Sequence, residues 1–406
     1  MPHRKLVLWA WFVGAHILVV ALGWVLPSQP MGDVYNVYEP WSRQALSGGP
    51  IVGITEPWVY PQLALIPMVA AWAFAWVGNY TLGWAVLVCL CNAAAFAVLI
   101  GRKPTRARSR AALGWLVFLV ALGPVGLYRI DAITVPLAIC ALLLVSRAPA
   151  VSGALLALGV WIKIWPAAAI GALVVAVRRG RWRIAAGAVT AAVAVMVVLV
   201  AIGGGPYLFG FVSAQVGRGL QMESTAATPF VWLATLGVPG YQVGFNPQII
   251  TFEVTGPGVD AVAAAMTPLM AIAAIGVYGI GAWQAWRGVS FARLAPPLLL
   301  SAVLVLIVFN KVGSPQFLSW LIAPLVLWIA LDEARIRSGL RLAVITLALT
   351  QLVYPIAFDL VRIAYPIGTV ILTARNVMLV VLLVWMLRRL ITAGSRGLPL
   401  DDRAAS

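Results

Sequence analysis

Long apolar stretches follow one another along almost the whole chain, and short polar or basic segments separate them. Stretches of roughly 15–27 residues are long enough, or nearly so, to cross about 30 Å of hydrocarbon as α-helices. Those between residues 132 and 178 are the shortest. The pattern predicts an all-α polytopic membrane protein with about 12 transmembrane helices, at residues 7–26, 82–100, 112–127, 132–146, 150–163, 164–178, 183–202, 259–284, 294–310, 316–331, 340–358 and 367–387.

One further apolar stretch, at residues 60–77, is ambiguous by length, and the distribution of basic residues decides its interpretation. Runs of arginine and lysine mark the cytoplasmic loops of membrane proteins. All such runs fall on one side only if 60–77 does not cross, which predicts a lateral or re-entrant helix in the first external loop and both termini in the cytoplasm. The alternative has one more crossing, with an inverted first half or an external tail. The runs are Arg102–Arg110, Arg178–Arg183, Arg335–Arg341 and Arg388–Arg389.

The composition supports a membrane location and excludes several other classes of protein. Of the 406 residues, 63% are hydrophobic and 10% are charged, and the mean hydropathy is +0.99. Such a chain cannot cover itself with polar surface, so a soluble enzyme, a secreted disulfide scaffold and a disordered chain are excluded. The net charge of +16 is concentrated in short loops, so we expect membrane lipid and no nucleic acid as a partner.

We expect one integral-membrane domain, 1–406. Its polar parts are a first external loop with the lateral helix at 27–81, a long external loop at 203–258 and a cytoplasmic tail at 388–406. In this topology, eight of the twelve acidic residues fall on the external side. Long loops in compact proteins usually carry function, so the external side is where we expect the chemistry.

The first external loop places Asp33 a few residues after the first span, beside Tyr35. A carboxylate at this position could act as a general base toward a hydroxyl group. Its other interpretation is a helix cap or a solvated loop acid. Glu39 follows six residues later, and Tyr35 and Glu39 are candidates for binding a sugar or an acceptor.

Several cations lie outside the basic loops, so we expect each of them to have a structural partner or a ligand. Arg129 and Asp131 stand two residues apart in an external turn, where a charge is costly unless it is paired or faces a cavity. Lys163 interrupts an otherwise apolar run between Trp161 and Trp165. Fixed cations of this kind could bind an anionic lipid headgroup, and a structural ion pair or an interfacial anchor is the alternative.

Two further polar clusters lie on the expected external side, one within residues 218–224 and the other within 310–316. They complete two sets of candidates. The candidate ligands of a donor phosphate are Arg129, Lys163, Arg218 and Lys311. The candidate contacts of a sugar or an acceptor are Tyr35, Glu39, Asp131, Gln221, Glu223 and Gln316.

Several familiar catalytic motifs are absent from the sequence, including a P-loop, a zinc-protease motif and a Ser-His-Asp order. The two histidines are His3, in the amino-terminal segment that we expect in the cytoplasm, and His16, within a span. A histidine-dependent mechanism is therefore not expected. The three cysteines lie in apolar runs and indicate neither a disulfide nor a metal site.

These motifs resemble those of the GT-C superfamily, polytopic glycosyltransferases that use polyprenyl-phosphate sugars. The shared features are an aspartate just after the first span, an external active side and the helix entry Tyr60-Pro61-Gln62-Leu63. The closer resemblance is to family 87, the polyprenol-phosphate-mannose-dependent mannosyltransferases of actinobacterial cell envelopes. It covers residues 20–330 approximately, and the segments that carry it are Arg129–Asp131, Trp161–Pro166, Arg218–Ser224 and Lys311–Gln316.

The resemblance implies a GT-C-type bundle in the plasma membrane, with its active site on the extracytoplasmic side. It implies inverting transfer of mannose from a polyprenyl-phosphate-mannose donor to a mannosylated glycolipid or lipoglycan acceptor, with an α-mannosidic product. Only Asp33 fits the family's catalytic base; many members carry two adjacent acids there, whereas the next acid here is Glu39.

Arginine and lysine can neutralise the leaving phosphate, so neither a metal ion nor another cofactor is expected. Three alternatives stay open at this point. One is an arabinosyl- or glucosyltransferase that uses a similar donor, another is a lipid-linked sugar transporter or flippase, and the third is a scaffold for another envelope enzyme.

Overall fold

The computed structural model describes residues 2–394 and is almost entirely helical. Residues 395–406, most of the expected cytoplasmic tail, lie outside the described residues. The elements are α1 (Pro2–Val25), α2 (Glu39–Leu46), α3 (Leu65–Ala70), α4 (Tyr80–Ile100), α5 (Arg106–Leu122), α6 (Asp131–Leu144), α7 (Pro149–Val160), α8 (Pro166–Ala176), α9 (Arg181–Ala201), α10 (Gly210–Val216), α11 (Thr228–Thr235), β1 (Gln242–Asn246), β2 (Thr251–Thr255), α12 (Val259–Trp286), α13 (Phe291–Val308), α14 (Ile322–Gln351), α15 (Phe358–Arg362) and α16 (Pro366–Ile391).

The predicted class, an all-α polytopic membrane protein, agrees with the structure. Within residues 2–394, eight helical segments are long and apolar enough to cross a membrane. Every predicted span falls on a helix, but α6, α7 and α8 have only 14, 12 and 11 residues. Because a full crossing takes about 20 residues, the number of 12 crossings stays a prediction.

Two predicted spans, 316–331 and 340–358, lie in one continuous helical segment that is broken at Asp332 (φ −160°, ψ 76°). Phe317 and Tyr354, near the two ends of this segment, line the same cavity. The chain therefore reverses direction at the break, and the two halves run antiparallel as two separate spans would.

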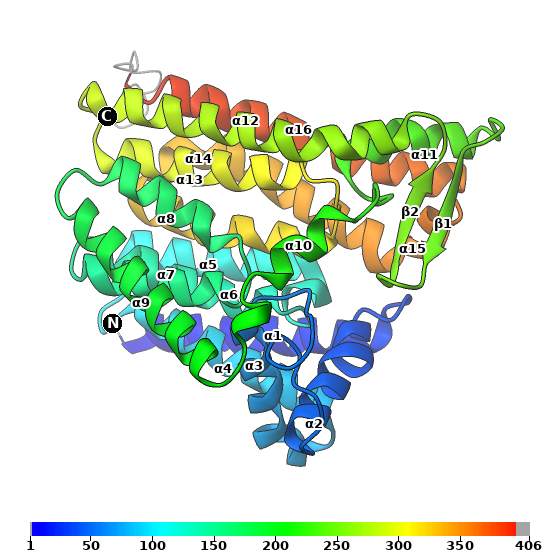
Figure 1. Ribbon diagram of the computed structural model, residues 1–406. Coiled ribbons are helices and arrows are strands. Elements are labelled where there is room, and N and C mark those ends of the chain that lie inside the picture. The colour runs from blue at the N-terminus through cyan, green and yellow to red at the C-terminus, as the bar shows by residue number, and fades with distance from the viewer. Residues whose placement is uncertain (1, 395–406) are drawn as a thin grey trace.

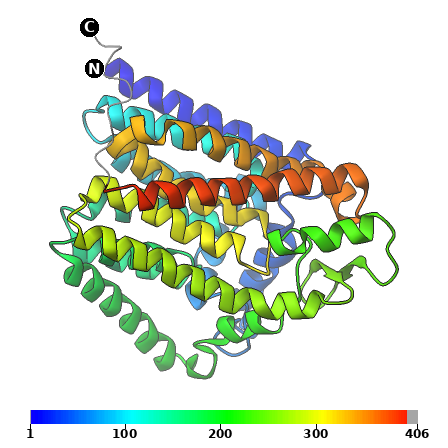
Figure 2. The same ribbon diagram turned by 90° about the horizontal axis from the view of Figure 1, so that it is seen from above.

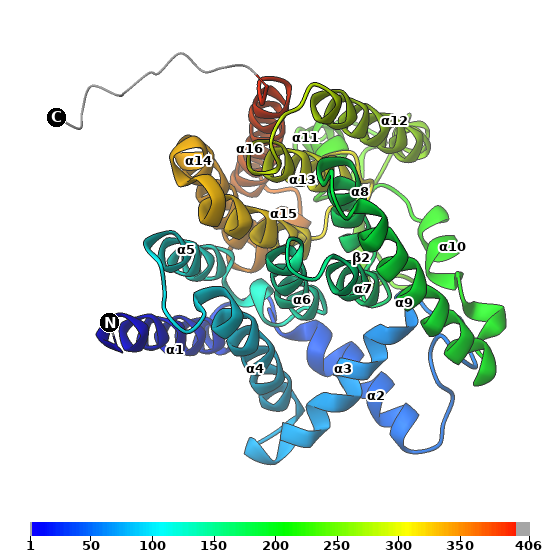
Figure 3. The same cartoon turned by 90° about the vertical axis from the view of Figure 1, so that its left-hand side faces the viewer.

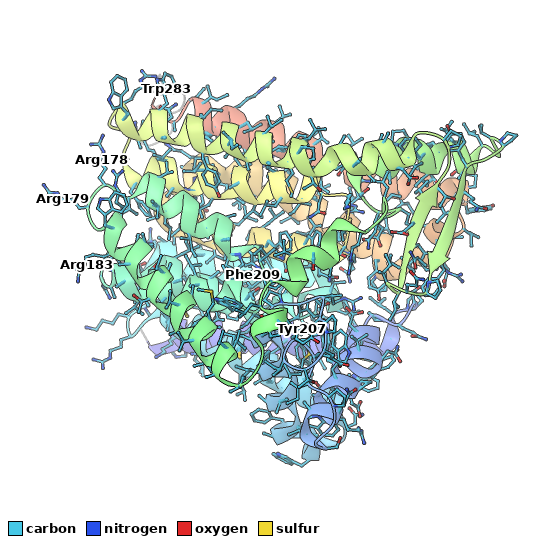
Figure 4. The ribbon with its side chains drawn as sticks, in the orientation of Figure 1. Arg178, Arg179, Arg183, Tyr207, Phe209 and Trp283 are labelled. Atoms are coloured by element: carbon cyan, nitrogen blue, oxygen red, sulfur yellow. The ribbon has the colours of Figure 1, made fainter. Side chains whose placement is uncertain are left out.

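The two ends of the helix bundle differ in chemistry. The first turn of α1 and the last turn of α16 lie at the same end, on the left in Figures 1 and 2, where the long helices run side by side. Arg178, Arg179 and Arg183 lie at this end too (Figure 4). The β1–β2 hairpin, α11 and α15 lie at the opposite end (Figure 1). These arginines therefore lie at the opposite end of the bundle from the hairpin, and the orientation of the bundle in the membrane stays a prediction.

Residues 60–77 form a series of short helices, with 3-10 turns at Gln62–Ala64 and Ala71–Val77 on either side of α3. In Figure 3, α2 and α3 lie at the edge of the bundle and run across the direction of view, whereas α5 and α13 are seen nearly end-on. The N–H of Leu63 donates to the C=O of Trp161 at 2.9 Å, which joins this segment to the turn after α7. The segment is shorter than the helices that are long enough to cross a membrane, and the lateral helix in an external loop stays a prediction.

Helices α7 and α9 approach each other closely because both carry glycine at the contact. A Cβ on Gly153 would fall on the backbone of Ile184, and a Cβ on Gly187 would fall on the backbone of Ala150. Small residues allow such approach between membrane helices. The close contact fixes the position of the turn that follows α7, which contains Lys163.

We expect Gly153→Ala to lower the unfolding temperature in detergent, because the added methyl group overpacks the contact at a cost of about 1–3 kcal/mol. The matched control is Gly276→Ala, on the exposed face of α12, where a Cβ meets open space. Its unfolding temperature should stay constant or rise, since alanine favours helix more than glycine does. Tryptophan fluorescence during heating measures both. Equal unfolding temperatures would contradict the close packing of α7 and α9.

Candidate functional site

A cavity of about 720 Å³ is lined in part by residues of the β1–β2 hairpin and of α15. These elements lie together at one end of the bundle (Figure 1). Gln221 and Gln316 lie on the cavity wall. The fold therefore brings together the predicted base, all the predicted phosphate ligands and part of the predicted sugar contacts, from segments far apart in the sequence. The charged lining residues are two carboxylates and four cations: Asp33, Glu223, Arg129, Lys163, Arg218 and Lys311.

Arg129 is the buried centre of one half of the cavity. Its side chain is 6% exposed and forms an ion pair with Asp33, whose side chain is 34% exposed. The guanidinium also donates to the Tyr354 hydroxyl at 3.0 Å and lies 5.4 Å from the centre of the Tyr354 ring. The Tyr354 hydroxyl donates in turn to the C=O of Gln29 at 3.1 Å. These contacts hold the Asp33 carboxylate at the cavity surface.

The chain directly after Asp33 winds as a short π-helix, Val34–Tyr38, of a kind that often occurs at functional sites. Its last residue, Tyr38, is fully buried and accepts a hydrogen bond from the N–H of Ile130 at 3.0 Å. The first loop is therefore tied to the turn before α6 by a hydrogen bond as well as by the Asp33–Arg129 ion pair.

Lys163 lies in the turn between α7 and α8, with its Nζ 3.8 Å from Oδ2 of Asp131. Asp131 is fully buried, and its Oδ1 accepts a hydrogen bond from Nε1 of Trp320 at 2.6 Å. The ammonium group also lies 4.6 Å from the centre of the Tyr60 ring. Asp131 thus sits beneath the cavity wall as the structural partner of Lys163, and the lysine alone reaches the cavity.

Residues 217–224 are held between strand β2 and the loop after α13. The N–H of Gln221 donates to the C=O of Lys311 at 3.0 Å, and the N–H of Gly313 donates to the side-chain oxygen of Gln221 at 3.2 Å. A Cβ on Gly313 would fall on the backbone of Glu223, so only glycine fits this contact. The two polar clusters of the sequence therefore form one unit.

Arg218 and Lys311 lie close enough to repel each other. Burial lowers the pKa of the Arg218 guanidinium, against the opposing effect of Tyr60 and Glu253. Burial and the neighbouring Arg218 lower the pKa of the Lys311 ammonium group, against the opposing effect of Glu253. An anion would relieve this repulsion, since opposite charge favours the protonated forms. The arrangement therefore favours an anionic ligand.

Glu223 is the second carboxylate of the cavity, with a side chain that is 12% exposed. Arg375 of α16 donates to the backbone C=O of Glu223 at 2.7 Å and lies 3.6 Å from its Oε2. Burial raises the pKa of Glu223 to about 7, against the opposing effect of Arg375 and Arg129. Its protonation state therefore changes in the neutral range.

Three predicted contacts lie outside the cavity wall. Glu39 forms an ion pair with Arg43 at 2.5 Å, one turn along α2. Tyr35 is half-buried and packs against the apolar cluster under the first loop. Asp131 lies beneath Lys163, as described above. These three residues are therefore not part of the cavity lining, in contrast to Gln221, Glu223 and Gln316.

Aromatic residues that the sequence did not single out also shape the site. Phe317 and Trp320 stack with their ring centres 4.2 Å apart, and Trp320 binds Asp131. Tyr354 binds Arg129. Tyr354 lies inside the predicted span 340–358, where the apolar pattern gives no sign of a polar contact.

The carboxylates of the cavity each lie beside an arginine, Arg129 or Arg375. Within residues 2–394, no three His, Cys, Asp or Glu side chains gather in a way that could hold a metal ion. Independence from metal ions and other cofactors stays a prediction.

Comparison with known proteins gives no match: no protein-family model, no curated protein and no solved structure matches this chain. The resemblance of the motifs to GT-C enzymes therefore stays a prediction. A functional assignment therefore depends on the residues and the geometry of the cavity.

We expect Asp131→Ala to lower the unfolding temperature strongly, because it leaves Lys163 and Nε1 of Trp320 without their buried partner. Breaking a buried ion pair costs about 3–5 kcal/mol. Asp359→Ala is the control, since it breaks an exposed pair with Arg362 at 2.7 Å and should cost about 1 kcal/mol at most. Combining Asp131→Ala with Lys163→Met should restore most of the loss in thermal unfolding in detergent. An Asp131→Ala variant as stable as the control would contradict the structural role of the pair.

Proposed function

We propose that the protein is an inverting membrane glycosyltransferase that transfers mannose from a polyprenyl-phosphate-mannose donor to a mannosylated glycolipid or lipoglycan, with an α-mannosidic product. The observation that carries this proposal is one cavity in which a partly exposed carboxylate, four cations and an apolar wall meet. Such a transfer needs a base, a phosphate site and a place for a lipid tail. The motif resemblance to GT-C family 87 supplies the sugar and the acceptor.

The charge of the cavity suits a phosphate. Its four cations exceed its two carboxylates by two positive charges. A phosphodiester donor carries one negative charge, and the phosphate monoester product carries up to about two. Cations fixed in a low-dielectric site therefore stabilise the leaving phosphate more than the bound donor, and this difference lowers the barrier.

The apolar wall suits a polyprenyl tail. Phe211 and Val212 of α10 and Met270 of α12 line the cavity. Val212 is also 51% exposed. This apolar side chain therefore lies both on the cavity wall and on the outer surface of the bundle. A tail that leaves the cavity there would stay in hydrocarbon while its phosphate lies among the cations.

Asp33 is the group best placed to act as the base. The acceptor oxygen forms a bond to the anomeric carbon while the bond from that carbon to the phosphate oxygen breaks, and its electron pair leaves with the phosphate. The proton of the acceptor hydroxyl passes to the Asp33 carboxylate. Arg129 supports this role, because the ion pair holds the Asp33 carboxylate where it faces the cavity.

We place the cavity on the outer face of the plasma membrane, in a bundle of 12 crossings with a lateral helix at 60–77. The separation of the basic runs from the cavity supports this orientation, because basic loops face the cytoplasm. A transporter or flippase would need a polar path through the bilayer, whereas the charged lining residues gather at one end. Mass spectrometry of envelope glycolipids with and without the gene would identify the sugar and the acceptor.

Asp33→Asn keeps the shape of the side chain but removes its ability to take up a proton. We expect sugar transfer to fall by about 10²–10⁴-fold or more. The assay uses purified protein, radiolabelled polyprenyl-phosphate mannose and extracted envelope lipids. Glu39→Gln, which removes an acid outside the cavity wall, is the matched control and should keep its activity. Thermal unfolding shows whether each variant is folded.

Transfer at the wild-type rate by folded Asp33→Asn would end the assignment of the base. A wild-type protein that transfers no sugar from any polyprenyl-phosphate donor would end the proposed function itself.

Single cysteines test the orientation of the chain, after the native cysteines are replaced by alanine. Asn36, Gln248 and Ala107 are all exposed side chains. Cysteine at position 36 or 248 should react with a membrane-impermeant maleimide added to intact cells, whereas cysteine at position 107 should react only after permeabilisation. Reaction at position 107 in intact cells would place the cavity on the cytoplasmic side.

A further inference from the structure

Glu223 has no role in the proposed transfer step, although it lines the cavity. Its Oε2 is buried and has no hydrogen-bond partner among the described residues. The nearest cation, Arg375, donates to the backbone C=O of Glu223 and stays 3.6 Å from Oε2. A buried carboxylate oxygen without a hydrogen bond destabilises the anion, so this position favours the neutral acid.

The charged and titratable groups that face Glu223 come from three neighbouring elements. They are Arg375 on α16, Arg129 in the turn before α6 and Tyr354 just after α14. Arg129 is already engaged by Asp33 and Tyr354. Burial outweighs both arginines and raises the pKa of Glu223 to about 7. At neutral pH a large share of the molecules therefore carries a proton on this group.

We propose that Glu223 binds the ligand phosphate as a neutral carboxylic acid, donating a hydrogen bond from its O–H to a phosphoryl oxygen. The proposal rests on the proposed function in taking a lipid phosphate as the ligand of the cavity. A carboxylate would repel the phosphate, whereas the acid donates to it. A bound phosphate in turn favours the acid over the carboxylate, so ligand binding and proton binding strengthen each other.

The affinity of the cavity for phosphate should depend on pH through the proton on Glu223. Below neutral pH Glu223 carries its proton and binds the phosphate. As the pH rises through about 7, the proton is lost, the donor disappears and a negative charge takes its place. The affinity for phosphate is therefore highest on the acid side and falls on the alkaline side.

Farnesyl methyl phosphate is a suitable probe, because a phosphodiester keeps one negative charge between about pH 5 and pH 9 and so does not titrate itself. The Kd of the wild-type protein for this probe should rise about tenfold between about pH 6 and pH 8. The Glu223→Gln variant carries a hydrogen-bond donor at every pH. Its Kd at every pH should therefore stay near the Kd that the wild-type protein has at about pH 6. Asp359→Asn, which removes an exposed acid outside the cavity wall, should keep the wild-type pH dependence.

A wild-type Kd that does not change with pH, or a Glu223→Gln variant that keeps the wild-type pH dependence, would overturn the role of Glu223. If Glu223→Gln does not fold, calorimetry of the wild-type protein decides, with two buffers of different ionisation enthalpy near pH 7. Uptake of about half a proton on binding supports the role, and no uptake overturns it.

The transfer assay separates this outcome from the proposed function. Sugar transfer combined with pH-independent binding of the probe removes only the role of Glu223. Binding of the probe with the expected pH dependence, in a protein that transfers no sugar, keeps that role and ends the assignment as a glycosyltransferase.

Discussion

The buried charge of Arg129 is the constraint on which the rest of the site depends. A guanidinium that is almost fully removed from solvent, in a chain whose surroundings are largely hydrocarbon, is stable only with close partners. Those partners come from the loop after α1 through Asp33 and from the turn after α14 through Tyr354. The ion pair and the hydrogen bond together therefore join three segments that are distant in the sequence. The ion pair also fixes the position of the proposed base, Asp33, at the cavity wall.

The same arrangement recurs around the cavity. Lys163 reaches the cavity with Asp131 beneath it, and Arg375 lies behind Glu223. In each pair a buried polar partner offsets part of the cost of burying an ionisable group. What the pairs leave on the cavity wall is an excess of positive charge next to an apolar surface. An anionic headgroup on a lipid tail, the ligand that we propose, matches both features.

The sequence predicted the helices and much of the site for two different physical reasons. Lipid requires continuous apolar helices, so the spans were visible as apolar stretches, including the two halves of α14. Cations outside the basic loops require a partner or a ligand, which is why Arg129, Lys163, Arg218 and Lys311 could be selected before their positions were known. The pairings themselves depend on tertiary contacts. Glu39 turned out to pair within α2, and Tyr354 could not be told from a lipid-facing residue in an apolar run. The short lengths of α6, α7 and α8 leave the number of crossings as a prediction.

We propose that this cavity binds the phosphate of a polyprenyl lipid. A cryo-electron microscopy structure of the protein with polyprenyl phosphate in lipid nanodiscs is the most direct test. We expect phosphate density within hydrogen-bond distance of Arg218 or Lys311, and density for the tail along α10 and α12. Headgroup density outside the cavity, for example beside Arg178 at the opposite end of the bundle, would contradict the proposal.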